Sequence, residues 1–129
     1  MDSHDVLQFR ASVRALGRVL YSLIAVACLP AHAAYNANLS GNVTQILTYN
    51  SGIILFSLDN QPTSNGSCAP QFFELDPAVS GTDAAGIAAF NRMYARLLEA
   101  YTLGQPVNAG FDNTANCGAM GYITTYRIG

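Results

Sequence analysis

The stretch FNRMYARLLEAYTLGQPVNAGF, residues 90–111, changes from helical to strand spacing within a few residues. Apolar residues recur three and four positions apart up to Leu103, which predicts an amphipathic helix from about Asp83 to Leu103. Thr82 or Asp83 can cap the start of this helix, and Gly104 with Pro106 ends it. The residues predicted to face the core are Ile87, Phe90, Tyr94, Leu97, Leu98 and Tyr101.

Strands are predicted on both sides of the helix, because β-branched and aromatic residues alternate there with polar ones. The predicted strands are residues 43–49, 53–58, 71–75, 106–111 and 121–128. Alternation in the first strand places Val43, Gln45, Leu47 and Tyr49 on one face. In the second strand, Ile54, Phe56 and Leu58 are predicted to point inward, and residues 50–52 supply the hairpin turn between the two strands.

This order of three strands, one helix and two strands predicts a mainly β fold. Within residues 34–129 it matches a five-stranded barrel of the oligonucleotide- or oligosaccharide-binding (OB) type, with its helix between strands three and four. We expect one domain. The outer helix face is rich in alanine and lightly charged: Ala85, Ala88, Asn91, Arg92, Ala95, Arg96 and Glu99. This face is either solvated or lies against the helix of another subunit.

The first 33 residues have the pattern of a signal peptide. Arg10, Arg14 and Arg18 precede the apolar run 19–29, and Ala33 ends a small-residue cleavage site. We therefore expect cleavage near Ala33 and secretion or periplasmic localisation. A lipoprotein signal ending at Cys28 is the alternative; Ala27 suits it, whereas Ala25 stands where leucine is expected.

The composition of residues 34–129 excludes several functions. This segment contains three arginines and six acidic residues, so its net charge is −3 and it offers no basic face for nucleic acid. It contains no lysine and no histidine. Without an imidazole base or an amine nucleophile, we expect a non-enzymatic protein with no cofactor and no metal.

Two cysteines remain after the expected cleavage. An even number in a small exported chain predicts a disulfide between Cys68 and Cys117. Such a bridge would reinforce a domain of 96 residues, which buries only a modest core.

Two segments resemble a known family. SGNVTQILTYNSG (40–52) and residues 90–111 look like the B subunits of subtilase-cytotoxin-type and typhoid-type toxins. The most specific part is the passage from helix to strand, formed by Tyr101, Gly104, Gln105, Pro106 and Val107. The likeness spans Leu39 to Phe111. It implies an oligosaccharide-binding barrel, assembled as a ring of five, that holds a secreted catalytic subunit and recognises cell-surface glycans, often sialylated.

In that family a serine near the start of the first strand helps to hold the sugar, and Ser40 is the matching residue. Aligning on the Ser-Gly pair at 51–52 instead shifts the register. The chain departs from the family in its single long-range cysteine pair and in the absence of tryptophan. Our candidate glycan-binding residues are Ser40, Tyr49, Asn65 and Tyr122, because tyrosines stack on sugars and polar loops bind hydroxyls.

Other interpretations remain open. A monomeric envelope or secreted protein-binding or inhibitor module would use the loop 59–70 against another protein. Glu74 and Asp76 are either a catalytic carboxylate pair or an exposed strand end. Two interpretations are open for a set of Asp and Asn residues: they are either oxygen ligands for calcium or ordinary turn formers. These residues are Asp59, Asn60, Asp112, Asn113 and Asn116.

Overall fold

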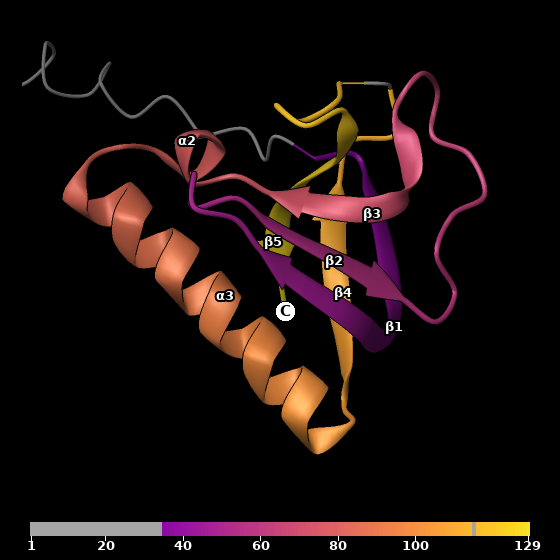
Figure 1. Ribbon diagram of the computed structural model, residues 1–129, viewed down its shortest axis with the longest axis horizontal. Coiled ribbons are helices and arrows are strands. Elements are labelled where there is room, and N and C mark those ends of the chain that lie inside the picture. Colours follow the sequence, from indigo (N-terminus) through magenta and orange to yellow (C-terminus); the bar gives the residue numbers. More distant parts are fainter. Residues whose placement is uncertain (1–34, 115) are drawn as a thin grey trace, which may run out of the picture. The chain divides into compact units, whose positions relative to one another are not determined.

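The computed structural model describes residues 35–114 and 116–129 (Figure 1). The predicted signal peptide and the alternative lipidation site at Cys28 lie outside this range. The elements are β1 (Ala37–Thr48), β2 (Ile54–Leu58), β3 (Ala69–Leu75), α2 (Pro77–Ser80), α3 (Ala84–Leu103), β4 (Pro106–Phe111) and β5 (Tyr122–Ile128). None of the helices in these ranges is long and apolar enough to cross a membrane.

The five strands form a closed barrel in the order β1-β2-β3-β5-β4. The predicted fold class, a mainly β five-stranded OB-like barrel with one long helix, is confirmed. All strand pairs are antiparallel except β3 with β5, which is parallel. The short helix α2 was not predicted. Asp76 caps it by accepting a hydrogen bond from the Ala78 amide at 2.8 Å.

Strand β1 is longer than predicted because it belongs to both halves of the barrel. Its first half, Ala37 to Asn42, pairs with β4, and its second half, Val43 to Thr48, pairs with β2. A bulge between Val43 and Gln45 separates the two halves. Such a bulge bends a strand, which lets one strand serve two sheets.

The same bulge corrects the predicted alternation in this strand. Val43 is buried in the core as expected, but Gln45 is exposed and Ile46 packs against the core. One extra residue in the bulge reverses which positions point inward. The predicted shared face of Val43 and Gln45 is therefore wrong.

The barrel interior is filled by aromatic and aliphatic side chains. Phe73 lies between Phe56 and Phe111, with ring centroids 5.3 and 5.2 Å away. The predicted inward positions Ile54, Phe56 and Leu58 all belong to this core.

The predicted boundaries of the long helix are confirmed. Asp83 is the N-cap and accepts a hydrogen bond from the Gly86 amide at 2.8 Å. Gly104 ends the helix in the left-handed conformation, with φ of 63°. Figure 1 shows α3 lying along one side of the barrel.

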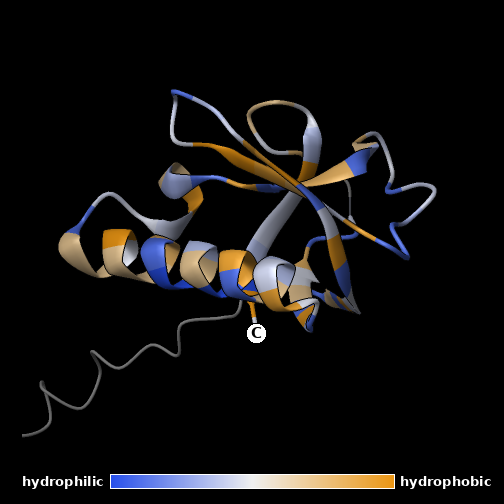
Figure 2. Ribbon diagram, turned by 60° about the horizontal axis from the view of Figure 1, so that its bottom comes forward, coloured by the Kyte–Doolittle hydropathy of each residue, from blue (hydrophilic) through white to orange (hydrophobic). Residues whose placement is uncertain are grey.

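The predicted inward face of α3 is only partly correct. Leu97 is fully buried, and Phe90 and Tyr94 pack against the core. Three other predicted core residues are exposed: Ile87 by 53%, Leu98 by 39% and Tyr101 by 50%. Met93 and Ala100 take their place toward the barrel. In Figure 2 the ribbon of α3 alternates between hydrophobic and hydrophilic colours along its length.

Three exposed apolar residues, Ile87, Leu98 and Tyr101, run along one line of the helix together with the half-buried Tyr94. We call these four residues the α3 stripe. A barrel touches only a narrow arc of a helix that lies across it, so the apolar arc here is wider than the arc that the barrel covers.

The predicted disulfide between Cys68 and Cys117 is confirmed. It joins the start of β3 to the segment before β5 and spans 49 residues of sequence. The disulfide therefore holds together the two long connections that precede the parallel strands β3 and β5.

Replacing both cysteines with serine should lower the free energy of unfolding by about 4 kcal/mol, the chain-entropy expectation for a loop of this length. Urea denaturation of the oxidised protein and of the double variant measures this difference. Wild-type protein unfolded with a reducing agent is the control and should match the variant. Equal stability of oxidised and reduced protein would contradict the expectation.

Candidate functional site

Polar side chains gather on the outer surface of β1, β4 and β5. In the first half of β1, Asn38, Ser40 and Asn42 are exposed, while alternate residues lie closer to the core. Cross-strand register places Ser40 opposite Asn108 and Asn38 opposite Gly110. Gly110 in turn pairs with Arg127 on β5. The strands thus bring residues up to 89 positions apart into one surface.

Hydrogen bonds connect these side chains. The Asn108 amide donates to the Ser40 hydroxyl oxygen at 2.8 Å. Arg127 Nη2 donates to the Asn38 side-chain oxygen at 3.0 Å and also to the side-chain oxygen of Asn108. Asn60 donates to the Ser40 carbonyl at 2.7 Å and ties the following loop to this edge.

Tyr35 completes the surface with an aromatic ring. The Arg127 guanidinium carbon lies 5.4 Å from the centre of this ring. A Cβ atom at Gly110 would lie 3.1 Å from the Tyr35 ring and 3.2 Å from Arg127 Cβ, so glycine here lets both side chains approach the sheet. We call Tyr35, Asn38, Ser40, Asn108 and Arg127 the Ser40 face.

Arg127 gives the Ser40 face a positive charge without a carboxylate partner. Across residues 35–114 and 116–129 the single ion pair is Arg96–Glu99 on α3. The partners of Arg127 are neutral amide oxygens and a π face, which orient the guanidinium without cancelling its charge. At Asn42, the last residue of the first half of β1, the Asp59 carboxylate accepts hydrogen bonds from the Asn42 side chain and backbone amide, and these bonds lower the pKa of Asp59.

Of the four predicted glycan-binding residues, Ser40 lies within this cluster. Tyr49 follows β1 in the hairpin and is 41% exposed. Tyr122 begins β5 and its ring meets Phe72 edge-on at 5.4 Å. Asn65 is buried, and its side chain donates to the Asp112 carbonyl at 3.0 Å. The four residues therefore occupy four different settings, and their role in binding stays a prediction.

Four members of the Ser40 face, Tyr35, Asn38, Asn108 and Arg127, are not among the predicted glycan-binding residues. Asn108 is a polar residue within an otherwise apolar strand, and Arg127 is the one arginine of residues 34–129 outside the helix. Those two irregularities were visible in the sequence. Their proximity to Asn38 was not, because it depends on the pairing of β1 with β4.

The disulfide end of the barrel is organised by Asp112. Its carboxylate accepts from the Asn36 side chain at 3.2 Å, from the Thr114 amide at 2.7 Å and from the Asn116 side chain at 2.6 Å. The Thr114 hydroxyl donates as well. These hydrogen bonds hold the pKa of Asp112 below its ordinary value of 3.8. This carboxylate is saturated by donors of its own fold, which favours a structural role over calcium binding.

The other acidic residues considered above also have partners. Glu74 is fully buried and binds the Met120 amide, and Asp76 caps α2. The described part of the chain contains no group of three or more acidic, cysteine or histidine residues placed to hold a metal ion.

No known protein-family model matches the chain, and no curated protein or solved structure shows significant similarity to it. The resemblance to toxin B subunits therefore stays a prediction.

Asp112→Asn should destabilise the protein at neutral pH by roughly 1–3 kcal/mol, because an amide cannot accept all the hydrogen bonds of the carboxylate. The pKa of Asp112 is lowered by folding, so its contribution is present above about pH 4 and is lost as the pH falls through the folded pKa. The variant should accordingly lose less stability than wild type below that pH.

Urea denaturation over a pH series measures both effects. Glu99→Gln, which changes an exposed carboxylate on α3, is the control and should follow wild type. If the free energy of unfolding of Asp112→Asn fell with acidification as steeply as that of wild type, the structural role of the Asp112 carboxylate would be contradicted.

Proposed function

We propose that this protein is an exported, non-enzymatic binding protein that recognises a glycan through the Ser40 face and assembles as an oligomer through the α3 stripe. Export follows from the predicted cleavage near Ala33. The observation that carries the proposal is the convergence of amide, hydroxyl, guanidinium and tyrosine groups on one exposed surface.

The chemistry of the Ser40 face suits a sugar. Glycan hydroxyls both donate and accept hydrogen bonds, and asparagine and serine side chains offer both capacities. A tyrosine ring supplies a flat apolar surface with a polar tip, against which a sugar ring packs. Because Arg127 is positioned and unpaired with any carboxylate, a sugar bearing a carboxylate would gain a charge-assisted hydrogen bond there. This favours acidic glycans such as sialylated ones.

The resemblance to toxin B subunits supports the same function from a different direction. The family places a sugar-contacting serine near the start of its first strand, and Ser40 lies in the first half of β1. The proposed partners are accordingly a cell-surface glycan and, if the toxin likeness extends to assembly, a secreted catalytic subunit.

The α3 stripe supports an oligomer. Ile87, Tyr94, Leu98 and Tyr101, with Asn91 between the first two, follow the alternating spacing of four and three that helices use to pack along each other. Small residues border the stripe at Ala88, Ala95 and Thr102, and this allows close approach of a second helix. Exposed apolar stripes of this length mark interaction surfaces in soluble proteins.

A monomer that binds an unrelated protein is the second candidate. The observation that favours it is the same stripe, since an apolar helix face also fits a partner groove. The native mass separates the two candidates.

Glycan binding is tested with immobilised sialylated glycans and their desialylated forms. We expect preference for the sialylated form, and a loss of about tenfold or more in Arg127→Gln, because a hydrogen bond to a charged group contributes about 1.5–3 kcal/mol. Ser40→Ala should weaken both forms. Arg92→Gln on α3 is the matched control and should bind as wild type. Glycan binding that is unchanged in both Arg127→Gln and Ser40→Ala would rule out the Ser40 face as the binding site. Absence of binding to any glycan would rule out the proposed glycan-binding function.

Oligomerisation is tested by the native mass of the exported, oxidised protein. We expect an assembly, with a ring of about five subunits if the toxin likeness holds, and we expect Leu98→Asp to dissociate it by burying a charge at the contact. Leu103→Asp is the matched control, since Leu103 is 60% exposed on the same helix but lies off the stripe. A wild-type monomer would contradict the oligomer and favour the second candidate.

A further inference from the structure

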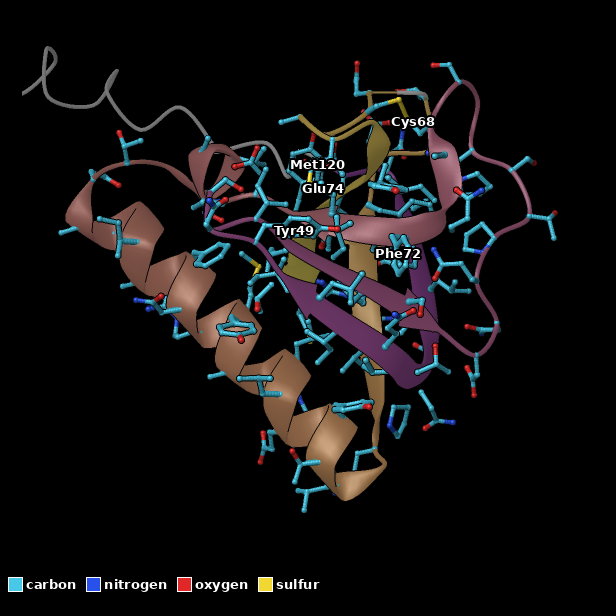
Figure 3. All side chains as sticks on the ribbon, in the orientation of Figure 1. Tyr49, Cys68, Phe72, Glu74 and Met120 are labelled. Carbon is cyan, nitrogen blue, oxygen red and sulfur yellow. A yellow bond between two sulfur atoms is a disulfide. The ribbon has the colours of Figure 1, made fainter. Side chains whose placement is uncertain are left out.

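Glu74 is a fully buried carboxyl group outside the barrel core. Its neighbours in β3, Phe73 and Leu75, belong to the core, so alternation directs Glu74 to the outer surface of the strand. There it is covered by the turn 118–121, which precedes β5. In Figure 3 the label of Met120 lies directly above that of Glu74, over β3.

The turn is built around this carboxyl group. The Met120 amide lies 3.2 and 3.1 Å from the two carboxylate oxygens. The turn is closed by hydrogen bonds of 2.9 Å from Gly121 to the Gly118 carbonyl and from Gly118 to the Tyr122 carbonyl. A Cβ atom on Gly118 would lie 2.2 Å from Glu74 Cδ, so any other residue at that position would have to displace the Glu74 carboxyl group.

Among the described residues, no cation forms an ion pair with Glu74. Its cross-strand neighbours are Leu55 on β2 and Thr124 on β5, both buried and uncharged. The covering turn consists of glycine, alanine and methionine. The charged side chain that acts most strongly on Glu74 is Asp76, directly after the same strand, and its charge is of the same sign.

The surroundings therefore tolerate the neutral carboxyl better than the carboxylate. Burial raises the pKa of Glu74 above its ordinary value of 4.5, and Asp76 adds to this, although the backbone amides of Met120, Tyr122 and Ala119 oppose it. Burying an unpaired charge costs free energy, and this cost falls when water reaches the charged group. The element that can move to admit water here is the covering turn.

We propose that Glu74 makes the turn 118–121 an acid-closed latch, in which the neutral carboxyl holds the turn on β3 and the carboxylate loosens it. The disulfide at Cys117 anchors the preceding residue, so the movement is confined to the segment between Cys117 and β5. Closing the latch fixes Met120, which is 38% exposed, and the Tyr122 ring that meets Phe72. The outer surface of β3 and β5 is then better ordered in acidic than in neutral surroundings.

The sign of the effect is opposite to that of Asp112. Because the pKa of Glu74 is raised on folding, its protonation stabilises the folded state below the unfolded pKa, and this stabilisation is lost as the pH rises through the folded pKa. This latch does not depend on glycan binding or on the oligomer.

The test is amide hydrogen exchange of Met120 in the exported, oxidised protein, followed from about pH 4 to about pH 8 and corrected for the intrinsic exchange rate. We expect the protection of Met120 to fall by about tenfold or more toward neutral pH, while core amides such as that of Phe73 keep theirs. Glu74→Gln keeps an acceptor for the Met120 amide without the charge, so its Met120 should stay protected throughout.

Glu99→Gln is the matched carboxylate control and should retain the wild-type profile. The wild-type profile is itself decisive, so the test does not depend on how well a variant folds. A Met120 protection factor that is constant with pH in wild type, or a wild-type pH dependence that persists in Glu74→Gln, would overturn the latch.

Discussion

Barrel closure by a single bent strand is the constraint on which the rest of this structure depends. Strand β1 pairs with β4 through its first half and with β2 through its second, and the bulge between Val43 and Gln45 makes the change of direction possible. With β1 shared, every strand has two neighbours and Phe56, Phe73 and Phe111 meet in the interior. The closed barrel leaves no unpaired edge strand among the described elements, so its interaction surfaces have to be side-chain faces.

Two such faces follow from the closure. The first half of β1 carries Ser40 and Asn38 beside Asn108 and Arg127, and the amide network orients a guanidinium that pairs with no carboxylate of the described residues. The second face belongs to α3, which lies against the barrel through a narrow arc and leaves Ile87, Leu98 and Tyr101 of the α3 stripe exposed. One face is polar and suits a glycan, whereas the other is apolar and suits a helix. The proposed glycan-binding oligomer would use both surfaces.

Three carboxylates show how burial and donors decide the behaviour of one chemical group. Asp59 and Asp112 accept several hydrogen bonds, so their ionised forms are stabilised and their pKa values fall. Glu74 is buried without a cation, and its pKa rises. Acidification therefore weakens the loops tied by the two aspartates while it tightens the turn over Glu74. The pH response is therefore local, and its sign differs between the two aspartates and Glu74.

The sequence by itself determined the local features. The limits of α3, the inward face of β2, the order of the five strands and the long helix, and the Cys68–Cys117 bridge were all predictable, because caps, alternation and cysteine number act within short segments or through simple pairing rules. Only the tertiary structure decided the bulge in β1, the exposure of Leu98, the burial of Glu74 and the meeting of Tyr35 with Arg127. Each of these depends on which segment, distant in the sequence, packs against the residue. Periodicity along the chain does not reveal such long-range packing.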